Sequence, residues 1–384
     1  MAFLTEAANR GSISTGPYQI DNSLVLEDAN EESLIRNYSG DGDRRTWTYS
    51  TWVKKIKFGS QFDYMYLISA AYTSIFFLNN DLLRVALYNG SSTVYANPSQ
   101  VFRDGSAWYH IVVTLDSTQG TAADRVKIYI NGVRVTEFDS YTTYTNMSQN
   151  EEFGLGEAAS NYQFGYFFAG GANNRGFSGY VAETHYVNGT ALDCTSFGEF
   201  DDDTGIWIPK QYTGSHGAKG FYFKFDDASN LGKDSATSGV GDFSENNITA
   251  ADQATDTPTN NFCTFNAIQN YDGKHIYTTG ATVFGLNADS GSGNTALGTI
   301  AVTKGKWYAE FKPTGTTSTS YPHNVFLGVG VMDQLQLLST GFLGGKANST
   351  AQGAGYYNAN GKIYRSSASV AWGNTYTAND IIGV

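Results

Sequence analysis

Hydrophobic and polar residues alternate with a period of two along much of the first half of the chain. In residues 126–130 the β-branched side chains fall on one face, and the polar and aromatic side chains fall on the other. Residues 108–116 precede this stretch and are dense in β-branched and aromatic residues, without Pro or Gly. Asn131-Gly132 follows and tolerates the positive φ angles of a tight hairpin. The pattern predicts an antiparallel sheet with one buried face.

Similar patterns predict strands on both sides of this hairpin. They occur at residues 23–27, 45–54, 63–70, 73–79, 82–88, 93–96, 162–170 and 176–187. The composition supports this prediction, because 43 Gly, only 6 Pro and 15% aromatic residues are typical of short strands joined by tight turns. The sequence therefore predicts an all-β protein.

The central hairpin carries a family resemblance. Residues 108–133 resemble the central hairpins of laminin-G-like domains, which belong to the concanavalin A-like jelly-roll class. Residues 45–54 match the early strand of that pattern, and residues 176–187 match its closing strand. The resemblance implies an antiparallel jelly-roll sandwich. It implies no single function, because this fold hosts lectins, hydrolases and inert structural modules.

The second half of the chain differs in composition and in its pattern of strands. Residues 201–262 contain one strand, at 220–225, in a composition rich in Asp, Ser, Thr, Asn and Gly, which predicts an extended linker. From residue 263 the order of strands resembles a SPRY-type β-sandwich, through the stretches KWYAEF, FLGVGV, GYYNANGKIY and NDIIGV. The chain stops at Val384, inside an expected central strand. We therefore expect further residues or another chain to complete this sheet.

These patterns divide the chain into four segments. Residues 1–20 are expected to form an N-terminal arm, and residues 21–200 a laminin-G-like jelly roll. Residues 201–262 are expected to form an extended linker with one strand, and residues 263–384 an incomplete SPRY-like β-sandwich. The fold class is all-β, with a concanavalin A-like sandwich followed by a second, incomplete sandwich.

An acidic run at residues 199–203 is the first candidate for chemistry. In a strand, Glu199, Asp201 and Asp203 would share one face, as the acidic trio of laminarinase-like members of this class does. The spacing departs from that trio, and the run follows the closing strand. Asp201, Asp202 and Asp203 are also the candidate ligands for Ca²⁺, with Asp41 and Asp43 as an alternative pair. A solvated acidic turn remains the competing interpretation.

Aromatic residues next to amides give the second candidate. Sugars bind by stacking their apolar faces on Tyr or Trp while amides and carboxylates take their hydroxyls. Tyr141, Tyr144, Asn146 and Tyr162 lie in a polar, aromatic part of the sequence and are the candidate glycan-binding residues. Ordinary loop tyrosines remain the competing interpretation.

Charge and targeting features restrict the partners. A formal net charge of −12 disfavours binding to nucleic acid or to an anionic membrane surface. The first residues lack the pattern of a signal peptide, and no apolar run reaches the roughly 18 residues of a membrane helix. We therefore expect synthesis in a cytosol and no membrane insertion.

The domain combination resembles virion and tail-fibre proteins of tailed bacteriophages. This resemblance implies a non-enzymatic structural component of the virion, a tail fibre or surface appendage that presents β modules for host attachment. It also implies docking on other virion proteins through residues 1–20 and a homo-oligomer, by analogy a trimer. Two alternatives stay open, a lectin that binds a host cell-surface glycan and a head-decoration protein. A polysaccharide hydrolase is a third and less favoured alternative.

Overall fold

The computed structural model describes most of the chain, in two compact units. The described residues are 18–61, 64–158, 161–167, 175–237, 239–268, 275–286, 296–302, 305–313, 326–330, 353–365 and 368–384. The first unit comprises the described residues up to Ile268, together with Tyr277–Phe284 and Gly298–Ile300. The second unit comprises the described residues of the remaining ranges.

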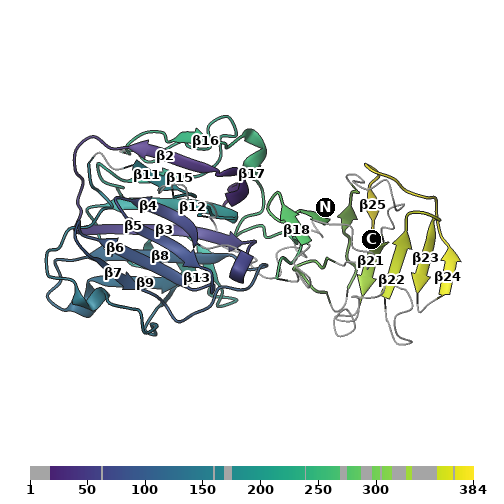
Figure 1. The fold of residues 1–384 in the computed structure, drawn as a ribbon, viewed down its shortest axis with the longest axis horizontal. Helices are drawn as coiled ribbons and strands as arrows, with labels where there is room; N and C mark the ends of the chain where they lie inside the picture. The colour runs from purple at the N-terminus through teal and green to yellow at the C-terminus, as the bar shows by residue number, and fades with distance from the viewer. Residues whose placement is uncertain are drawn as a thin grey trace. The chain divides into compact units, whose positions relative to one another are not determined.

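Two antiparallel sheets form the first unit (Figure 1). Sheet A has the order β10 (Val133–Arg134), β9 (Val126–Ile130), β8 (Tyr109–Asp116), β3 (Thr46–Lys55), β12 (Gly179–Asn188), β1 (Ser23–Leu26) and β17 (Gln253–Ala254), and β15 (Phe221–Phe223) also pairs with β12. Sheet B has the order β16 (Ser244–Asn246), β2 (Ser33–Asn37), β11 (Asn161–Phe164), β4 (Tyr64–Ala70), β5 (Thr73–Leu78), β6 (Leu83–Tyr88) and β7 (Thr93–Ala96).

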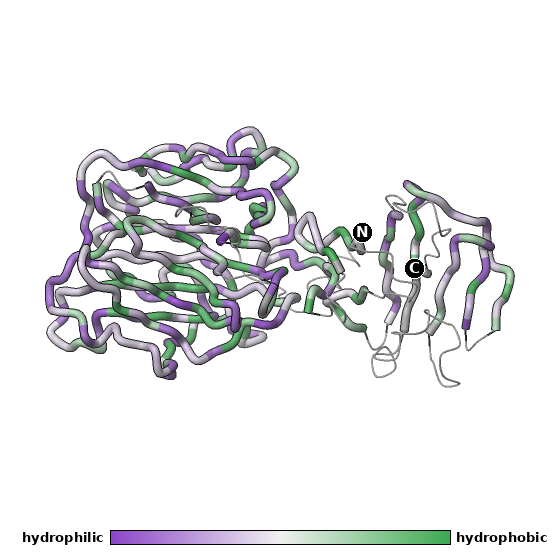
Figure 2. Tube along the Cα trace, viewed as in Figure 1, coloured by the Kyte–Doolittle hydropathy of each residue, from purple (hydrophilic) through white to green (hydrophobic). Residues whose placement is uncertain are grey.

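The main hydrophobic core lies between these two sheets. Alternate residues of β3, among them Trp47 and Tyr49, are fully buried in it. Alternate residues of β5, Ile75 and Phe77, join them from the other sheet. Figure 2 shows hydrophobic residues recurring along the strands of this unit. The period of two in the sequence thus marks the inner faces of a sandwich, as predicted.

The predicted hairpin turn is confirmed. Val133 pairs with Ile130, so β9 and β10 are joined by Asn131 and Gly132 alone, with φ angles of 47° and 80°. Glycine is required here for a second reason, because a Cβ atom on Gly132 would lie 2.2 Å from the ring of Trp207. Turn chemistry and close packing therefore select the same residue.

Residues 201–262 are part of the sandwich, and the prediction of a linker was wrong. Strand β15 pairs with β12, β16 with β2, and β17 with β1. The large apolar side chains of this segment are few, but they are placed in the main core: Phe221, Phe223, Phe225, Leu231, Phe243 and Ile248. Its polar residues satisfy the backbone between them, as where Asp234 accepts from the N–H groups of Tyr222 and Ala236. Composition alone could not show this placement.

Short elements complete the first unit. Strands β13 (Gly198–Phe200) and β14 (Trp207–Pro209) form a separate pair. Strands β18 (His275–Thr278) and β19 (Val283–Leu286) form another pair, of which Tyr277–Phe284 belongs to the first unit. The 3-10 turns are η1 (Asp28–Asn30), η2 (Gly59–Gln61), η3 (Ala122–Asp124), η4 (Tyr144–Asn146), η5 (Cys194–Ser196) and η6 (Ala250–Asp252). Of the expected N-terminal arm, residues 1–17 lie outside the described residues, and Ile20 is buried in this unit.

The second unit is also built of antiparallel strands. Its four-stranded sheet has the order β21 (Phe326–Gly330), β22 (Gly353–Tyr357), β23 (Lys362–Arg365) and β24 (Ala368–Ala371). Strand β20 (Glu310–Phe311) pairs with β25 (Ile382–Gly383). Strands β20, β21 and β25 fall within the stretches predicted to be strands, β22 and β23 overlap them, and β24 was not predicted. The likeness to a SPRY sandwich stays a prediction. Within the described residues, no helix combines the length and apolar character that crossing a membrane requires.

Replacing Phe223 by Ala should destabilise the sandwich, because its ring is fully buried against Phe164 and Phe243. Truncation of a buried Phe costs about 3–5 kcal/mol. Urea unfolding monitored by circular dichroism measures this loss. Phe200→Ala is the control, because the Phe200 side chain is 51% exposed and its loss should cost clearly less. Equal and small losses for both variants would mean that residues 201–262 do not contribute to the core.

Candidate functional site

The outer face of sheet A is covered by the protein's own chain. A second hydrophobic cluster lies there, in which Trp52 and Val112 of the sheet pack with Phe197 and Trp207. Tyr277 and Ala281 add to the same cluster from further along the chain. The cover removes these positions of sheet A from contact with a large ligand.

The outer face of sheet B carries a different cluster, made of the sheet's own strands and of Phe167 beside them. We call it the aromatic face, and its members are Tyr64, Tyr66, Tyr72, Phe76, Tyr88, Tyr95 and Phe167. The ring of Tyr66 stacks on Phe76 with centroids 4.6 Å apart, and on Phe167 with centroids 4.8 Å apart. The tyrosine at one end, Tyr64, is 37% exposed.

Tyr72 is the most exposed ring of the aromatic face, at 65%. It lies with Ala71 in the turn between β4 and β5, where both residues have positive φ angles of 64° and 44°. Such angles suit Gly or Asn, and a bulky aromatic residue adopts them at a cost. The Tyr72 ring contacts Tyr88 edge-on at 5.5 Å between centroids. An exposed tyrosine held in a strained turn is a candidate for a functional role.

Two arginines accompany the aromatic rings. The guanidinium of Arg84 lies 4.7 Å from the ring centroid of Tyr95, and that of Arg175 lies 5.7 Å from Phe167. Burial raises the pKa of Tyr66 to about 12, and the charges of Arg175 and Arg84 oppose that rise. In the part of the chain that the structure describes, neither arginine forms an ion pair with a carboxylate. Two cationic side chains thus lie at the aromatic face of a protein whose net charge is −12.

The glycan-binding residues expected from the sequence do not come together. Tyr162 is fully buried in the core, where its ring lies 3.9 Å from that of Tyr38. Tyr144 is also buried in the core, at η4. Tyr141 is 70% exposed, and Asn146 is exposed nearby in the sequence. A buried ring offers no face to a sugar, so Tyr144 and Tyr162 are removed from the candidate site.

The acidic run is a turn. Strand β13 ends at Phe200, so the carboxylates of Glu199, Asp201 and Asp203 do not share one strand face. Asp201 Oδ1 accepts from the N–H groups of Asp203 and Thr204, which closes the turn. The described residues contain no group of three or more His, Cys, Asp or Glu side chains that could hold a metal ion. The candidate Ca²⁺ ligands Asp201, Asp202 and Asp203 do not form such a group, and the alternative of an acidic trio on one strand face, which the sequence already disfavoured, does not match this turn.

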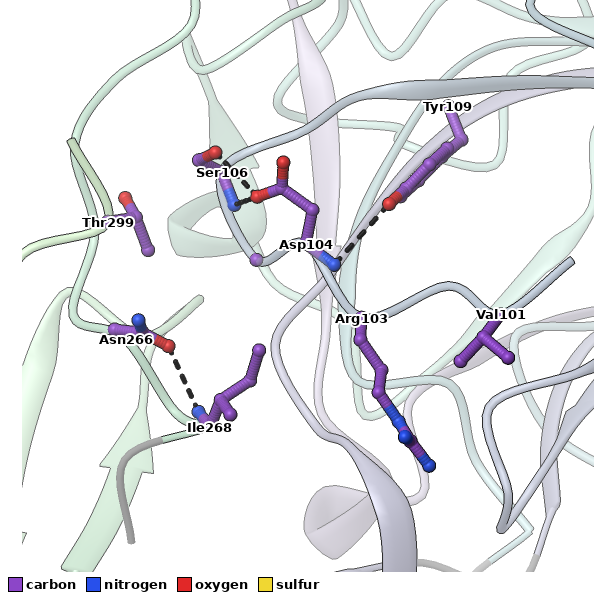
Figure 3. Close-up of a pocket in the computed structure, with 9 residues that line it drawn as sticks. Val101, Arg103, Asp104, Ser106, Tyr109, Asn266, Ile268 and Thr299 are labelled. Carbon is purple, nitrogen blue, oxygen red and sulfur yellow. Dashed lines mark hydrogen bonds between the residues drawn. The ribbon is translucent and has the colours of Figure 1, made fainter.

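A shallow pocket of about 410 Å³ lies beside the loop that precedes β8 (Figure 3). Asp104, Ser106 and Tyr109 line one side, and Asn266 and Thr299 line the other. Asp104 Oδ1 accepts hydrogen bonds from the backbone N–H and the hydroxyl of Ser106, and Asn266 accepts from the N–H of Ile268. The polar groups are thus engaged in shaping their own loops, and the pocket presents few groups for a ligand.

A buried polar network lies beneath the cover of sheet A. Glu183 has a φ of 47° at a β-bulge in β12, and its carboxylate accepts hydrogen bonds from Tyr18 and Tyr222. Burial raises the pKa of Glu183, as an acid catalyst would require. The Glu183 side chain is nearly enclosed, however, and both donors belong to the protein. We interpret this carboxylate as a structural group.

Histidines extend the same network. His185 Nδ1 lies 3.0 Å from His216 Nε2, and Trp207 Nε1 donates to His110 Nδ1 at 2.9 Å. Desolvation lowers the pKa of His110 to about 3 and that of His216 to about 4. The expectation that His110 and His185 are structural groups fits these contacts. The aromatic face, in contrast, was not predicted, although Tyr64, Tyr66 and Phe76 alternate with buried residues in the sequence.

A family model matches part of this sandwich. Residues 34–189 match the family model of the concanavalin A-like lectin/glucanases superfamily, of the laminin-G type. The match and the two-sheet architecture identify a concanavalin A-like domain, as the sequence predicted. No curated protein matches this chain at a significant level.

Three solved structures resemble parts of the chain. A native heptameric SAP-like pentraxin from Limulus polyphemus is 17% identical, with 46% of this chain and 79% of that chain covered and a TM-score of 0.33. A proposed carbohydrate binding protein from Bacteroides ovatus is 15% identical, with 62% and 61% covered and a TM-score of 0.43. The LG1-3 region of the laminin alpha2 chain is 14% identical, with 50% and 36% covered and a TM-score of 0.32. At these values no ligand or activity transfers to this chain.

The free energy of unfolding of the first unit should decrease as the pH is lowered, because His110 is buried in its neutral form. The His110 imidazole is neutral in the folded protein down to a pH of about 3, whereas the unfolded chain takes up a proton below a pH of about 6.5. The stability contribution is therefore complete above pH about 6.5 and is lost below it, by about 1.4 kcal/mol per pH unit. Urea unfolding of the protein and of His110→Gln between pH about 7 and about 4 measures the difference in slope.

The free energy of unfolding of His110→Gln should depend less steeply on pH than that of the wild type. The difference in slope should correspond to one proton. Above pH about 7 the two curves should run parallel, since His110 then titrates in neither state. This comparison does not depend on the stability lost through the substitution itself. Parallel curves over the whole range would show that His110 is not held neutral by burial.

Proposed function

We propose that the protein is a non-enzymatic carbohydrate-binding protein that holds a glycan on the aromatic face of sheet B. The observation that carries this proposal is the exposed, strained Tyr72, with Tyr64 also exposed on the same face. The stacked rings of Tyr66 and Phe76 are buried and form the base of this face. Sugar rings present C–H groups on one face, and these pack on exposed tyrosine rings. The match of residues 34–189 to a superfamily of lectins and glucanases supports the same class of ligand.

The arginines select the charge of the glycan. Arg84 and Arg175 have no carboxylate partner among the described residues, and a guanidinium binds a carboxylate or sulfate group in a bidentate manner. A glycan that carries uronic acid, sialic acid or sulfate groups would supply the missing charge. We therefore favour an anionic saccharide over a neutral one.

Binding without turnover fits the distribution of carboxylates better than hydrolysis does. Glycoside hydrolysis needs two carboxyl groups flanking one bond, open to substrate. Glu183, with its raised pKa, is enclosed beneath the cover of sheet A. The contacts described for the aromatic face include arginines, tyrosines and phenylalanines but no carboxylate.

Tyr72→Ala should weaken glycan binding roughly fivefold, because one stacking ring contributes on the order of 1 kcal/mol. Screening an array of neutral and anionic glycans with the full chain identifies the ligand, and titration calorimetry then measures its affinity for the variant. Tyr141→Ala is the matched control, since Tyr141 is exposed to a similar extent but lies outside the aromatic face. Loss of binding in Tyr141→Ala alone would move the site to the loop that the sequence suggested.

We further propose that this binding serves a tailed-phage virion, in which the protein is a tail fibre or other surface appendage. The resemblance of the sequence to such proteins and the presence of two β-rich units in one chain support this setting. A fibre of this kind would be a symmetric oligomer, for which a trimer is our proposal, docked through residues 1–20. A head-decoration protein is the second setting.

Purified virions should contain the protein in repeated copies. A cryo-EM map of the intact particle is expected to show β-rich density that fits the first unit, arranged with rotational symmetry. Density on the tail would support the fibre, and density on the capsid would support the decoration protein. Absence of the chain from purified particles, checked by mass spectrometry, would contradict the virion setting while leaving the glycan proposal open to its own test.

A further inference from the structure

Three buried side chains meet where residues 256–261 lie against sheet A. Lys54, on β3, has its Nζ atom 2.8 Å from Asp256 Oδ2 and 2.9 Å from Asn261 Oδ1. Nζ also donates to the carbonyl oxygen of Phe262 at 2.9 Å. Lys54 is 0% exposed, Asp256 5% and Asn261 4%. An amine, a carboxyl group and a carboxamide are thus in contact in a site closed to water.

Aromatic residues surround this group. Trp108 Nε1 donates to Asp256 Oδ1 at 3.0 Å, which fixes the carboxyl group. The ring centroid of Tyr180 lies 5.5 Å from Lys54 Nζ, and the Tyr180 and Trp108 rings meet edge-on. Asn261 Nδ2 donates to the carbonyl oxygen of Ser106 at 2.7 Å, which orients the carboxamide with its oxygen towards Lys54. Each reacting group is therefore held by a separate contact.

The neighbouring lysine shows what is specific to this arrangement. Lys55 is also 0% exposed and has its Nζ 2.9 Å from Asp81 Oδ1. Its second acceptor is the backbone carbonyl of Phe102, at 3.2 Å. At Lys54 the carboxamide of Asn261 joins a carboxylate and a backbone carbonyl as an acceptor for the same Nζ atom.

We propose that Lys54 and Asn261 form an intramolecular isopeptide bond, with Asp256 as the catalytic acid and base. The geometry points to this reaction because the amine, the carboxamide and the proton carrier are already in contact without water. The groups are supplied by one chain, and the reaction needs no cofactor or oxidant.

The reaction balances within the three side chains. A proton passes from the Lys54 ammonium to Asp256, which leaves a neutral amine and a carboxylic acid. The lone pair of Nζ attacks Cγ of Asn261 while Asp256 gives its proton to Oδ1. The carboxylate then takes a proton from Nζ and gives it to Nδ2, which leaves as ammonia when the C–N bond breaks. Oδ1 returns its proton to Asp256 as the carbonyl re-forms. The products are one Nζ–Cγ amide, one ammonia molecule and the regenerated carboxylic acid of Asp256.

The surroundings favour this sequence of steps. Desolvation raises the pKa of Asp256, against the opposing effect of Lys54, so the site stabilises the neutral carboxylic acid that must donate a proton. Lack of water prevents hydrolysis of the carboxamide, and holding the groups in contact removes most of the entropic cost of their encounter. Ammonia that leaves such a site does not return readily, which makes the bond permanent.

The bond would lock the last segment of the sandwich onto its central strand. Residues 54 and 261 are 207 positions apart, and β17 is held to β1 by pairs at only two residues. A covalent link of that span constrains the unfolded chain as a disulfide does, but it resists reduction. It would hold the segment that carries Asp256 and Thr259 against sheet A under mechanical load.

Intact-mass spectrometry of the full chain tests the proposal directly. The measured mass should be lower than the sequence mass by one ammonia molecule, and tandem mass spectrometry of a digest should find a branched peptide that joins Lys54 to Asn261. A mass equal to that of the sequence would overturn the proposal and leave the three groups as a buried ion pair. So would an ammonia loss that maps to any other residue.

Variants separate the roles of the three side chains. Asp256→Asn, Asn261→Ala and Lys54→Arg should each retain the unreacted mass, and on a denaturing gel they should migrate differently from the looped wild type. Lys55→Arg is the matched control and should still lose one ammonia molecule. Should Asp256→Asn fail to fold, the mass of the wild-type protein still decides. A cross-link that forms at an unchanged rate in folded Asp256→Asn would rule out the catalytic role of Asp256.

Discussion

A β-sandwich has four faces, and only the inner two cover each other. Each sheet of this protein must therefore either hide its outer face or expose it, and the two sheets differ in this respect. Sheet A carries Trp52, Val112 and Tyr180 outward, and the chain returns over them with Phe197 and Trp207. Sheet B carries its own aromatic rings outward and keeps an exposed tyrosine at the turn between β4 and β5. Most of what distinguishes the two sides of the domain follows from this division.

The segments that cover sheet A bury polar groups among hydrophobic side chains. Lys54, Asp256, Glu183 and His185 are buried there, and each has partners supplied by the protein. Buried ion pairs contribute little net stability because desolvation opposes their attraction, whereas leaving one member unpaired costs several kcal/mol. These groups therefore fix the position of the covering residues more than they add to stability. A covalent bond at Lys54 would turn that positional role into a permanent one.

The outer face of sheet B differs, because Tyr64 and Tyr72 remain exposed on it. Its rings are packed tightly enough to be rigid, and the two arginines beside them have no carboxylate partner among the described residues. A rigid aromatic surface loses little conformational entropy when it takes a ligand, and guanidinium groups add charge selectivity. The same domain thus has one face suited to internal attachment and one suited to recognition. Display of a glycan-binding face on a firmly closed scaffold fits a surface-attachment protein.

The sequence by itself determined the all-β class, the strands around the central hairpin and the turn at Asn131 and Gly132. Those features depend on local rules, namely the period of two and the need for positive φ angles. It also carried the resemblance to laminin-G-like domains that the family match of residues 34–189 bears out.

Only the tertiary structure decided which residues meet. Phe223 and Phe243 belong to the core although their segment looks like a linker, because a few well-placed rings suffice when the polar residues satisfy the backbone. Tyr162 is buried and Tyr72 is exposed, a difference that no local pattern encodes. Lys54 lies 207 positions from Asn261, and their contact exists only once the chain has folded back over sheet A. Contacts between residues far apart in sequence are set by packing of the whole sandwich, and the candidate sites are made of such contacts.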